Sequence, residues 1–228
     1  MNESPGLPFT DLRPGEDAAE VAAAIARVVD AGWFVLGPEV EAFEREFASA
    51  CGARFAVGVG NGTDAITLAL RALDIGPGDE VIVPAITAAF TGLAVIACGA
   101  IPRIIDVEDA TLTLDPAACA AAVTSRTKAI IPVHLYGQPA DMAAIRRVAE
   151  RHALAIVEDC CQAHLATENN VPVGTRALSG AALLADARTE FRTAPIALTG
   201  TVPRLLRPDS AVIVTLNHLS GVAGDRRR

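Results

Sequence analysis

Two short clusters of polar residues carry the side chains that ligand binding or catalysis requires. The first is NGTDA at 61–65, which follows a predicted strand and opens a predicted helix. Gly62 allows close approach of the backbone, the Thr63 hydroxyl donates hydrogen bonds, and the first N–H groups of a helix attract anions. The pattern suits a phosphate group, but an ordinary helix start with a Thr or Asp cap would have the same sequence.

The second cluster is VEDCCQAH at 157–164, at the end of a predicted buried strand. A carboxylate at such a position, followed by an amide and an imidazole, is costly unless a polar partner meets it. A cationic ring nitrogen of a cofactor would be one such partner, and a solvated acid in a surface loop is the alternative. The adjacent cysteines at 160 and 161 are interpreted as small packing residues rather than as redox groups.

A third segment, Pro132–Pro139, also follows a predicted strand, and it either lines the same cleft or forms a simple turn. None of the four histidines has the spacing of metal ligands, so no metal site is predicted. The five cysteines, an odd number, are expected to be reduced thiols in a cytosolic protein.

The composition argues against several classes of partner. A net charge of −8 disfavours nucleic acid and anionic membranes. The first twenty residues show no secretory signal, so a cytoplasmic location is predicted. The uncharged stretch 81–102 has the length of a membrane span, but its proline, glycines, threonines and charged flanks favour a buried strand followed by a buried helix.

The spacing of apolar residues predicts helices that alternate with strands. The predicted helices are Asp17–Ala31, Pro38–Cys51, Asp64–Leu73, Thr87–Cys98, Pro116–Val123 and Asp141–His152. The predicted strands are Phe55–Val59, Val81–Val83, Arg103–Val107, Lys128–Val133 and Ala155–Glu158. This rhythm predicts an α/β fold with three layers (α/β/α) and a mainly parallel sheet, whose ligands bind beyond the carboxyl ends of the strands.

The character of the chain changes after Gly174. Residues 1–174 contain 11 basic and 23 acidic residues, whereas residues 175–228 contain 8 and 4, and all eight of these cations are arginine. Only Ala211–Leu216 resembles a strand there. We therefore predict a folded domain over 1–174 and a divergent, Arg-rich tail over 175–228 to which no domain is assigned.

Four segments of the chain form a set of motifs in a fixed order. They are GWFVLGPEVEAFEREFA (32–48), GNGTDAITLALRALDIGPGDEVIVPAIT (60–87), IIPVHLYGQPADM (130–142) and IVEDCCQAH (156–164). Together they resemble the DegT/DnrJ/EryC1/StrS aminotransferases. The resemblance covers about residues 8–174 and implies the large domain of the aspartate-aminotransferase fold, without its small C-terminal domain. It also implies pyridoxal 5'-phosphate as cofactor, a keto-sugar nucleotide and an amino donor as substrates, and a homodimer. A dinucleotide-binding enzyme is disfavoured because no G-x-G-x-x-G motif has the required spacing.

The resemblance implies a role for four residues. Gly62 and Thr63 would bind the cofactor phosphate, Asp159 would pair with the pyridine nitrogen, and Gln162 would meet the phenolic oxygen of the ring. The pairing with Asp159 would keep the ring protonated, which is what a protein must supply to this cofactor.

The chain departs from the family pattern at two places. Ala88 stands where relatives often have an aromatic residue that stacks on the ring, although Phe90 lies two residues further on. More seriously, no Ser-Phe-x-x-x-Lys segment follows Val173-Gly174, so the lysine that forms the Schiff base is missing. Arginine stays protonated and cannot replace it.

The remaining candidate for that amine is Lys128, the only lysine of the chain, which is predicted to start a strand at the end of the sheet away from the ligands. We therefore predict a truncated, catalytically incompetent member of the family with no catalytic residue. The alternative is a non-catalytic fragment that binds pyridoxal phosphate weakly or binds a full-length relative.

Overall fold

The computed structural model describes residues 15–53, 55–175 and 211–215. The chain divides into two compact units, residues 1–41 with 217–228 and residues 42–216. The predicted tail 175–228 lies almost entirely outside the described residues, so the boundary at residue 174 stays a prediction.

The described part of the first unit contains helix α1 (Ala18–Ala31) and the start of α2 (Pro38–Cys51). Helix α1 ends as its sequence predicts, because Gly32 adopts a left-handed conformation with φ 62° and returns its N–H to the carbonyl of Val29. The side chains of Arg27 and Glu39 form an exposed ion pair at 2.7 Å.

Four parallel strands form the sheet of the second unit. They are β2 (Glu80–Pro84), β3 (Ile101–Ile105), β4 (Thr127–Ile130) and β5 (Ala155–Ile156), in the order β3-β2-β4-β5. Every residue of β2 is buried, as expected for a central strand that is covered on both faces. Edge strand β3 starts two residues earlier than predicted, because Pro102, which lacks an N–H, is tolerated at the edge of a sheet.

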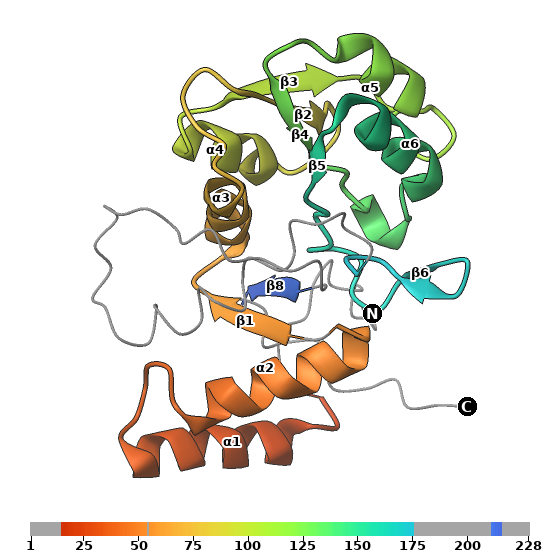
Figure 1. Cartoon of the computed structure of the whole chain (residues 1–228). Coiled ribbons are helices and arrows are strands. Elements are labelled where there is room, and N and C mark those ends of the chain that lie inside the picture. The colour runs from red at the N-terminus through yellow and green to blue at the C-terminus, as the bar shows by residue number, and fades with distance from the viewer. Residues whose placement is uncertain (1–14, 54, 176–210, 216–228) are drawn as a thin grey trace, which may run out of the picture. The chain divides into compact units, whose positions relative to one another are not determined.

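Helices cover both faces of this sheet and make the three predicted layers (Figure 1). On one face, Val81 and Val83 pack with residues of α3 (Gly62–Ala72) and α4 (Ala89–Ala97). On the other face, Ile82 packs with residues of α5 (Pro116–Ala122) and α6 (Met142–His152). This alternation follows from the two-residue period of a strand.

Side chains at the helix starts satisfy the free N–H groups there. Asn61 accepts a hydrogen bond from the N–H of Asp64 at 2.9 Å and caps α3. Asp115 and Asp141 cap α5 and α6 in the same way, at 2.7 and 2.8 Å. Helix α3 therefore begins at Gly62, two residues before the predicted start.

Two smaller sheets complete the described part of the second unit. Strand β1 (Phe55–Val59) pairs in parallel with β8 (Ala211–Thr215), which confirms the strand predicted at 211–216. Strands β6 (Thr167–Glu168) and β7 (Val171–Pro172) form an antiparallel hairpin that the sequence reading missed. Its turn consists of two asparagines with φ of 51° and 59°, a known signal for tight hairpins.

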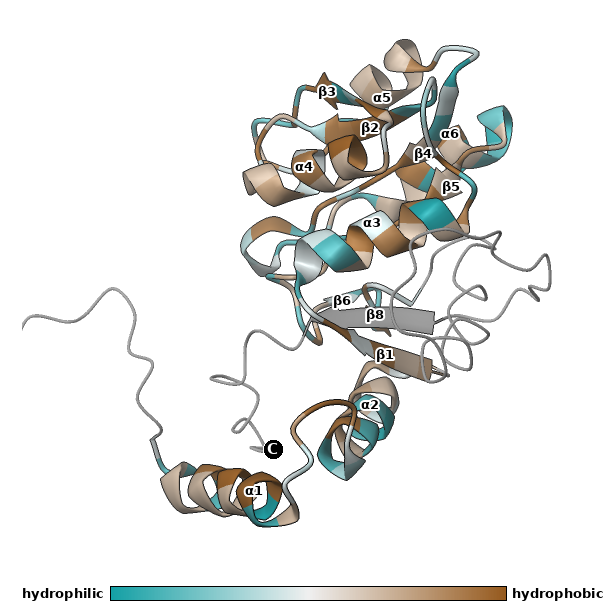
Figure 2. Cartoon of the chain, turned by 90° about the vertical axis from the view of Figure 1, so that its left-hand side faces the viewer, coloured by the Kyte–Doolittle hydropathy of each residue, from teal (hydrophilic) through white to brown (hydrophobic). Residues whose placement is uncertain are grey.

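The uncharged stretch 81–102 is divided among β2, α4 and the start of β3 (Figure 2). The predicted strand and helix are confirmed, but the prediction that the helix is buried is wrong, because Phe90, Leu93 and Ile96 of α4 are exposed. Among the described helices, none has both the length and the apolar character that crossing a membrane requires. All five cysteines are free thiols in the structure.

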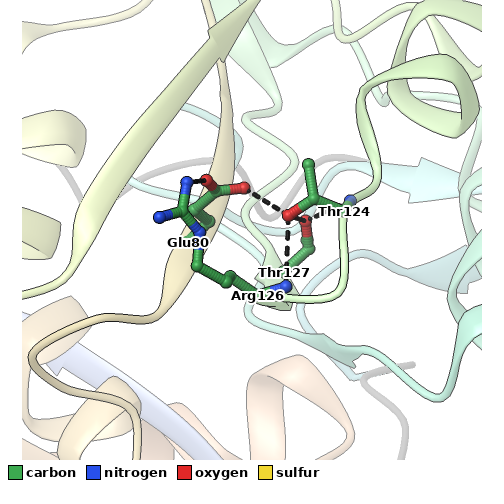
Figure 3. A network of polar contacts seen from close by, with 4 residues as sticks. All are labelled: Glu80, Thr124, Arg126 and Thr127. Atoms are coloured by element: carbon green, nitrogen blue, oxygen red, sulfur yellow. Dashed lines mark hydrogen bonds and ion pairs between the residues drawn. The ribbon is translucent and has the colours of Figure 1, made fainter.

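A polar network joins the amino ends of β2 and β4 (Figure 3). Glu80, only 2% exposed, accepts a hydrogen bond from Thr124 Oγ1 at 2.7 Å and binds the Arg126 guanidinium through its other oxygen. The N–H of Thr124 donates to Thr127 Oγ1 at 2.9 Å. The bond from Thr124, together with the contacts to Arg126, lowers the pKa of Glu80 despite its burial.

Candidate functional site

Asp159 lies just beyond the carboxyl end of β5 and is 8% exposed. Its backbone continues the parallel pairing with the segment after β4, through hydrogen bonds with the carbonyl of Pro132 and the N–H of His134. One carboxylate oxygen, Oδ2, accepts a hydrogen bond from Thr91 Oγ1 at 2.9 Å, and Oδ1 accepts one from the N–H of Cys161 at 3.2 Å. The backbone and α4 together fix the position of this carboxylate.

No cationic side chain among the described residues pairs with Asp159. A carboxylate has about four acceptor positions, and the donors from Thr91, the N–H of Cys161 and the Cys161 thiol leave capacity for another. A buried carboxylate is expensive unless a cation or enough donors meet it. The site therefore suits a ligand that brings a positively charged N–H group.

The third segment of the sequence lies next to this cluster. Gln162 Oε1 accepts a hydrogen bond from the N–H of Tyr136 at 3.1 Å. Tyr136 belongs to a short 3-10 helix, η1 (Leu135–Gly137), and has a left-handed φ of 55°. Because an N–H donor must meet an oxygen, the Gln162 side-chain NH₂ group points elsewhere and is available to an acceptor. The segment 132–139 thus contacts the 157–164 cluster rather than forming a separate turn.

The NGTDA cluster forms the start of α3, beyond the carboxyl end of β1. The Asn61 side chain and carbonyl accept the N–H groups of Asp64 and Ala65. Within the described residues, the N–H groups of Gly62 and Thr63 have no partner. They are the free donors of a helix N-terminus, which attracts anions.

Helix α4 connects the two clusters. Thr67, one turn after Thr63, donates to the Thr63 carbonyl at 2.7 Å and lies 3.3 Å from the Ala94 carbonyl of α4. The same helix α4 carries Thr91, which binds Asp159. The start of α3, with its free N–H donors, and the buried Asp159 carboxylate are therefore held in one packed unit.

A buried network of hydrogen bonds, which was not predicted from the sequence, lies beside Asp159. The N–H of Ala140 donates to His134 Nδ1 at 3.0 Å, so His134 carries its hydrogen on Nε2. Nε2 lies 3.1 Å from Glu158 Oε2, and that oxygen also accepts the N–H of Gly174 at 2.8 Å. The network connects three loop segments around Asp159. Its signal in the sequence was a histidine and a glutamate, His134 and Glu158, that each follow a predicted strand.

The same network decides how a neighbouring group of possible metal ligands is interpreted. Ligand atoms of His134, Glu158 and Cys160 lie within 4.8 Å of one another. A metal on Nε2 would require a hydrogen on Nδ1, where the N–H of Ala140 already donates. Burial and the nearby carboxylates of Glu158 and Asp159 raise the pKa of the Cys160 thiol well above its usual value. This geometry disfavours a metal and a reactive thiolate alike.

The two sequence departures have clear positions. Ala88 precedes α4 with an extended backbone, and the Phe90 side chain is 63% exposed on the first turn of that helix. Lys128 lies near the amino end of β4 and lines a cavity of about 590 Å³ together with acidic residues such as Asp79 and Glu150. Five residues of extended chain, roughly 16 Å, separate Lys128 from Val133, which pairs with Asp159.

Fold and site together define a parallel α/β domain with free N–H donors at the start of α3 and a buried carboxylate that no cation among the described residues pairs with. The sequence model of the DegT/DnrJ/EryC1/StrS aminotransferase family matches residues 16–182, and the chain belongs to that family. This confirms the resemblance and the fold class.

Several characterised proteins are similar to this chain. The dTDP-3-amino-3,4,6-trideoxy-alpha-D-glucose transaminase of Streptomyces venezuelae is 55% identical over 164 residues, which are 71% of this chain and 43% of that enzyme. The crystal structure of S. venezuelae DesV in complex with a ketimine intermediate matches with a TM-score of 0.69 at 55% identity, covering 71% of this chain and 44% of DesV. NtdA from Bacillus subtilis, solved with bound cofactor PMP, matches with a TM-score of 0.67 at 37% identity, covering 71% and 38% of the two chains.

This chain spans somewhat less than half the length of the curated relatives that it matches first. The similarity therefore concerns the part of the chain that carries the two polar clusters.

Proposed function

We propose that this chain forms the part of a sugar aminotransferase that binds the phosphate and pyridine ring of pyridoxal phosphate. The observation that carries the proposal is the buried Asp159 carboxylate, which has spare acceptor capacity and no cationic partner among the described residues. A protonated pyridine nitrogen supplies both a positive charge and an N–H donor. When bound, such a cofactor serves as an electron sink for chemistry at a carbon attached to its amine.

The remaining predicted contacts fit the same ligand. The free N–H groups of Gly62 and Thr63 would receive the phosphate at the start of α3. The NH₂ group of Gln162, oriented by the bond from the Tyr136 backbone, would donate to the phenolic oxygen of the ring. These residues bind and orient the ring, while Asp159 holds the proton at its nitrogen.

Covalent attachment of the cofactor is not expected in these 228 residues. A neutral amine is required for it, and the only lysine, Lys128, lies at the amino end of the sheet. We therefore propose that the chain by itself holds the cofactor through non-covalent contacts and does not transaminate.

Nucleotide-linked sugars are the proposed substrate class of the whole protein, with an amino donor as second substrate. Support comes from the relatives, because two of the most similar ones are transaminases of dTDP-linked amino sugars. The chain alone, incubated with a dTDP-linked keto sugar and an amino acid donor, is expected to yield no amino sugar.

Calorimetric titration with pyridoxamine phosphate tests the cofactor site, because this form of the cofactor has no aldehyde and reports only non-covalent binding. Asp159→Asn, which keeps the shape and removes the charge, should weaken binding about 10–100-fold. The matched control is Asp109→Asn, which removes an exposed carboxylate in the loop before α5. Equal affinity of the wild-type chain and Asp159→Asn would contradict the assignment.

A comparison of two ligands tests the phosphate contacts. Thr63→Ala keeps the backbone N–H and removes the hydroxyl, which is the second donor predicted for the phosphate. It should weaken the binding of pyridoxamine phosphate and leave that of pyridoxamine, which lacks the phosphate, unchanged. A similar loss for both ligands would place Thr63 away from the phosphate.

Borohydride reduction tests the lack of covalent attachment. The chain is mixed with pyridoxal phosphate, reduced, and analysed by mass spectrometry with and without excess pyridoxamine phosphate. We expect no adduct that the excess ligand prevents. A stoichiometric adduct that competes with it would disprove this part of the proposal.

A second candidate function is that of a non-catalytic partner of a full-length relative. Apolar side chains exposed on α4 and on edge strand β3 favour it: Phe90, Leu93, Ile96, Ile101 and Ile104. Size-exclusion chromatography with light scattering, using the S. venezuelae transaminase as probe, should then show a complex that Leu93→Asp removes and Leu112→Asp, a change at another exposed leucine, keeps. Separate elution of the two proteins would reject this candidate.

A further inference from the structure

Two buried threonines of this chain use their hydroxyl groups in different ways. Thr67 in α3 donates to the carbonyl of Thr63, four residues earlier, which is the usual bond of a threonine inside a helix. Thr91, on the first turn of α4 and 1% exposed, instead donates to Asp159, 68 residues further along the chain. The Thr91 side chain is thus turned from its own helix toward the candidate site.

A second hydroxyl extends this contact. The Oγ1 atoms of Thr87 and Thr91 lie 3.0 Å apart. A carboxylate only accepts hydrogen bonds, so the single hydroxyl hydrogen of Thr91 is used by Asp159. Thr87 must then be the donor to Thr91. The result is a directed chain of hydrogen bonds, Thr87 to Thr91 to Asp159.

The backbone geometry explains why these two threonines meet. Thr87 precedes the extended residue Ala88, and Thr91 donates its backbone N–H to the Ala88 carbonyl at 3.1 Å in the first turn of α4. Four residues apart, the two side chains lie on the same side of the helix start. Asp159 is placed against this side by the pairing of its backbone with the segment after β4.

We propose that Thr91, supported by Thr87, is a positioning residue that orients the Asp159 carboxylate toward a protonated ring nitrogen and keeps the proton on that nitrogen. The inference rests on the proposed function, because it assigns the ring of the cofactor to Asp159. A hydroxyl that donates to one oxygen of a carboxylate fixes the orientation of the whole group. Held by Thr91 and by the N–H of Cys161, the carboxylate then faces the ring nitrogen and attracts the positive charge that the proton brings.

Loss of this donor should be visible on the ligand. The experiment uses the full chain and pyridoxamine phosphate labelled with ¹⁵N in the ring. Thr91→Val should weaken binding about fivefold to tenfold, as expected on losing a hydrogen bond to a charged group. It should also move the ring ¹⁵N resonance from the pyridinium position toward that of neutral pyridine, because the carboxylate is no longer held toward the ring nitrogen and stabilises its proton less.

Three further variants separate positioning from packing. Thr91→Ser restores the hydroxyl and should return both the affinity and the resonance to the wild-type values. Thr67→Val removes a hydroxyl of similar burial and should move neither, since Thr67 bonds backbone carbonyls. Thr87→Val should shift the resonance in the same direction by a smaller amount, and it serves with Thr91→Ala if Thr91→Val does not fold.

The outcomes distinguish the inference from the proposed function. If the wild-type chain binds and Asp159→Asn weakens binding, but Thr91→Val changes neither affinity nor resonance, the role of Thr91 is wrong and the cofactor site stands. If the wild-type chain does not bind pyridoxamine phosphate, the proposed function fails, and the inference fails with it. A loss of thermal stability in Thr91→Val without a shift of the ¹⁵N resonance would show a purely structural role.

Discussion

Glu80 and Asp159 are two buried carboxylates at opposite ends of one parallel sheet, 2% and 8% exposed. Each accepts a hydrogen bond from a threonine hydroxyl, Thr124 for Glu80 and Thr91 for Asp159. The two carboxylates differ in whether a cationic side chain binds them. Glu80 binds Arg126, whereas no cation among the described residues binds Asp159.

This difference separates a structural carboxylate from one that is prepared for a ligand. At the amino end of the sheet, Arg126 and Thr124 complete the surroundings of Glu80 and join two strands. At the carboxyl end, Asp159 is held in place but keeps a free acceptor position. Burial of a charge alone therefore does not identify a binding site, and the lack of a cationic partner among the described residues is the informative part.

The largest effect expected from this comparison concerns thermal stability in the absence of ligand. Glu80→Gln removes the charge that Arg126 and Thr124 bind, and it should lower Tm by about 5 °C for a domain of this size. Asp159→Asn removes a charge that has no cation, so Tm should stay the same or rise. Differential scanning calorimetry at pH 7 measures both changes.

The outcome for Asp159→Asn decides whether the comparison holds. A fall in Tm as large as that of Glu80→Gln would mean that Asp159 already has its full set of partners within the protein. The two carboxylates would then be equivalent, and the argument for a ligand at Asp159 would lose its basis.

The pH dependence of stability should differ between the wild-type chain and Glu80→Gln. The pKa of Glu80 is lowered from 4.5 in the folded protein by the bond from Thr124 and the contacts with Arg126. A depressed carboxyl pKa contributes stability that is fully present above the unfolded value and is lost as the pH falls through the folded value.

We therefore expect the stability difference between these two proteins to be constant from pH 7 to about pH 5.5 and to shrink below about pH 4.5. Urea denaturation at a series of pH values measures it. A difference that grows on acidification would show that the sign of the Glu80 contribution is wrong.

A smaller effect comes from the two matched threonines. Thr124→Val removes one neutral donor from Glu80 and should cost about 1–2 kcal/mol of unfolding free energy without changing the affinity for pyridoxamine phosphate. Thr91→Val should reduce that affinity and affect stability less. Similar effects of the two variants on both measurements would remove the distinction between the two ends of the sheet.

Most elements of this fold follow from its sequence because local signals agree with packing. The amphipathic helices and the buried strands begin and end within about three residues of their predicted limits, as for α1 at Gly32 and α6 at Asp141. The start of α3 was placed too late because the capping role of Asn61 was overlooked, although the spacing of Asn61 and Asp64 carries the signal.

The candidate site is less accessible to sequence reasoning. Spacing alone left two interpretations for NGTDA and for the 157–164 cluster, and the family resemblance supplied the roles of Asp159 and Gln162. The bonds of Thr91 to Asp159 and of His134 to Glu158 join residues 68 and 24 positions apart. Such contacts arise from how the strands are ordered in the sheet, and a single sequence does not give that order.

Substitution of Lys128 should have the smallest effect. It tests the same comparison at the amino end of the sheet. Lys128 is exposed, near the amino end of β4, in a cavity that it shares with Asp74, Asp79 and Glu150. Lys128→Met should change the affinity for pyridoxamine phosphate less than twofold and the unfolding free energy by less than about 0.5 kcal/mol. Titration calorimetry and urea denaturation measure the two quantities. A tenfold weaker affinity would place the cofactor at the amino end of the sheet. The free acceptor position of Asp159 would then have no role in binding. Lys128 would again be a candidate for covalent attachment.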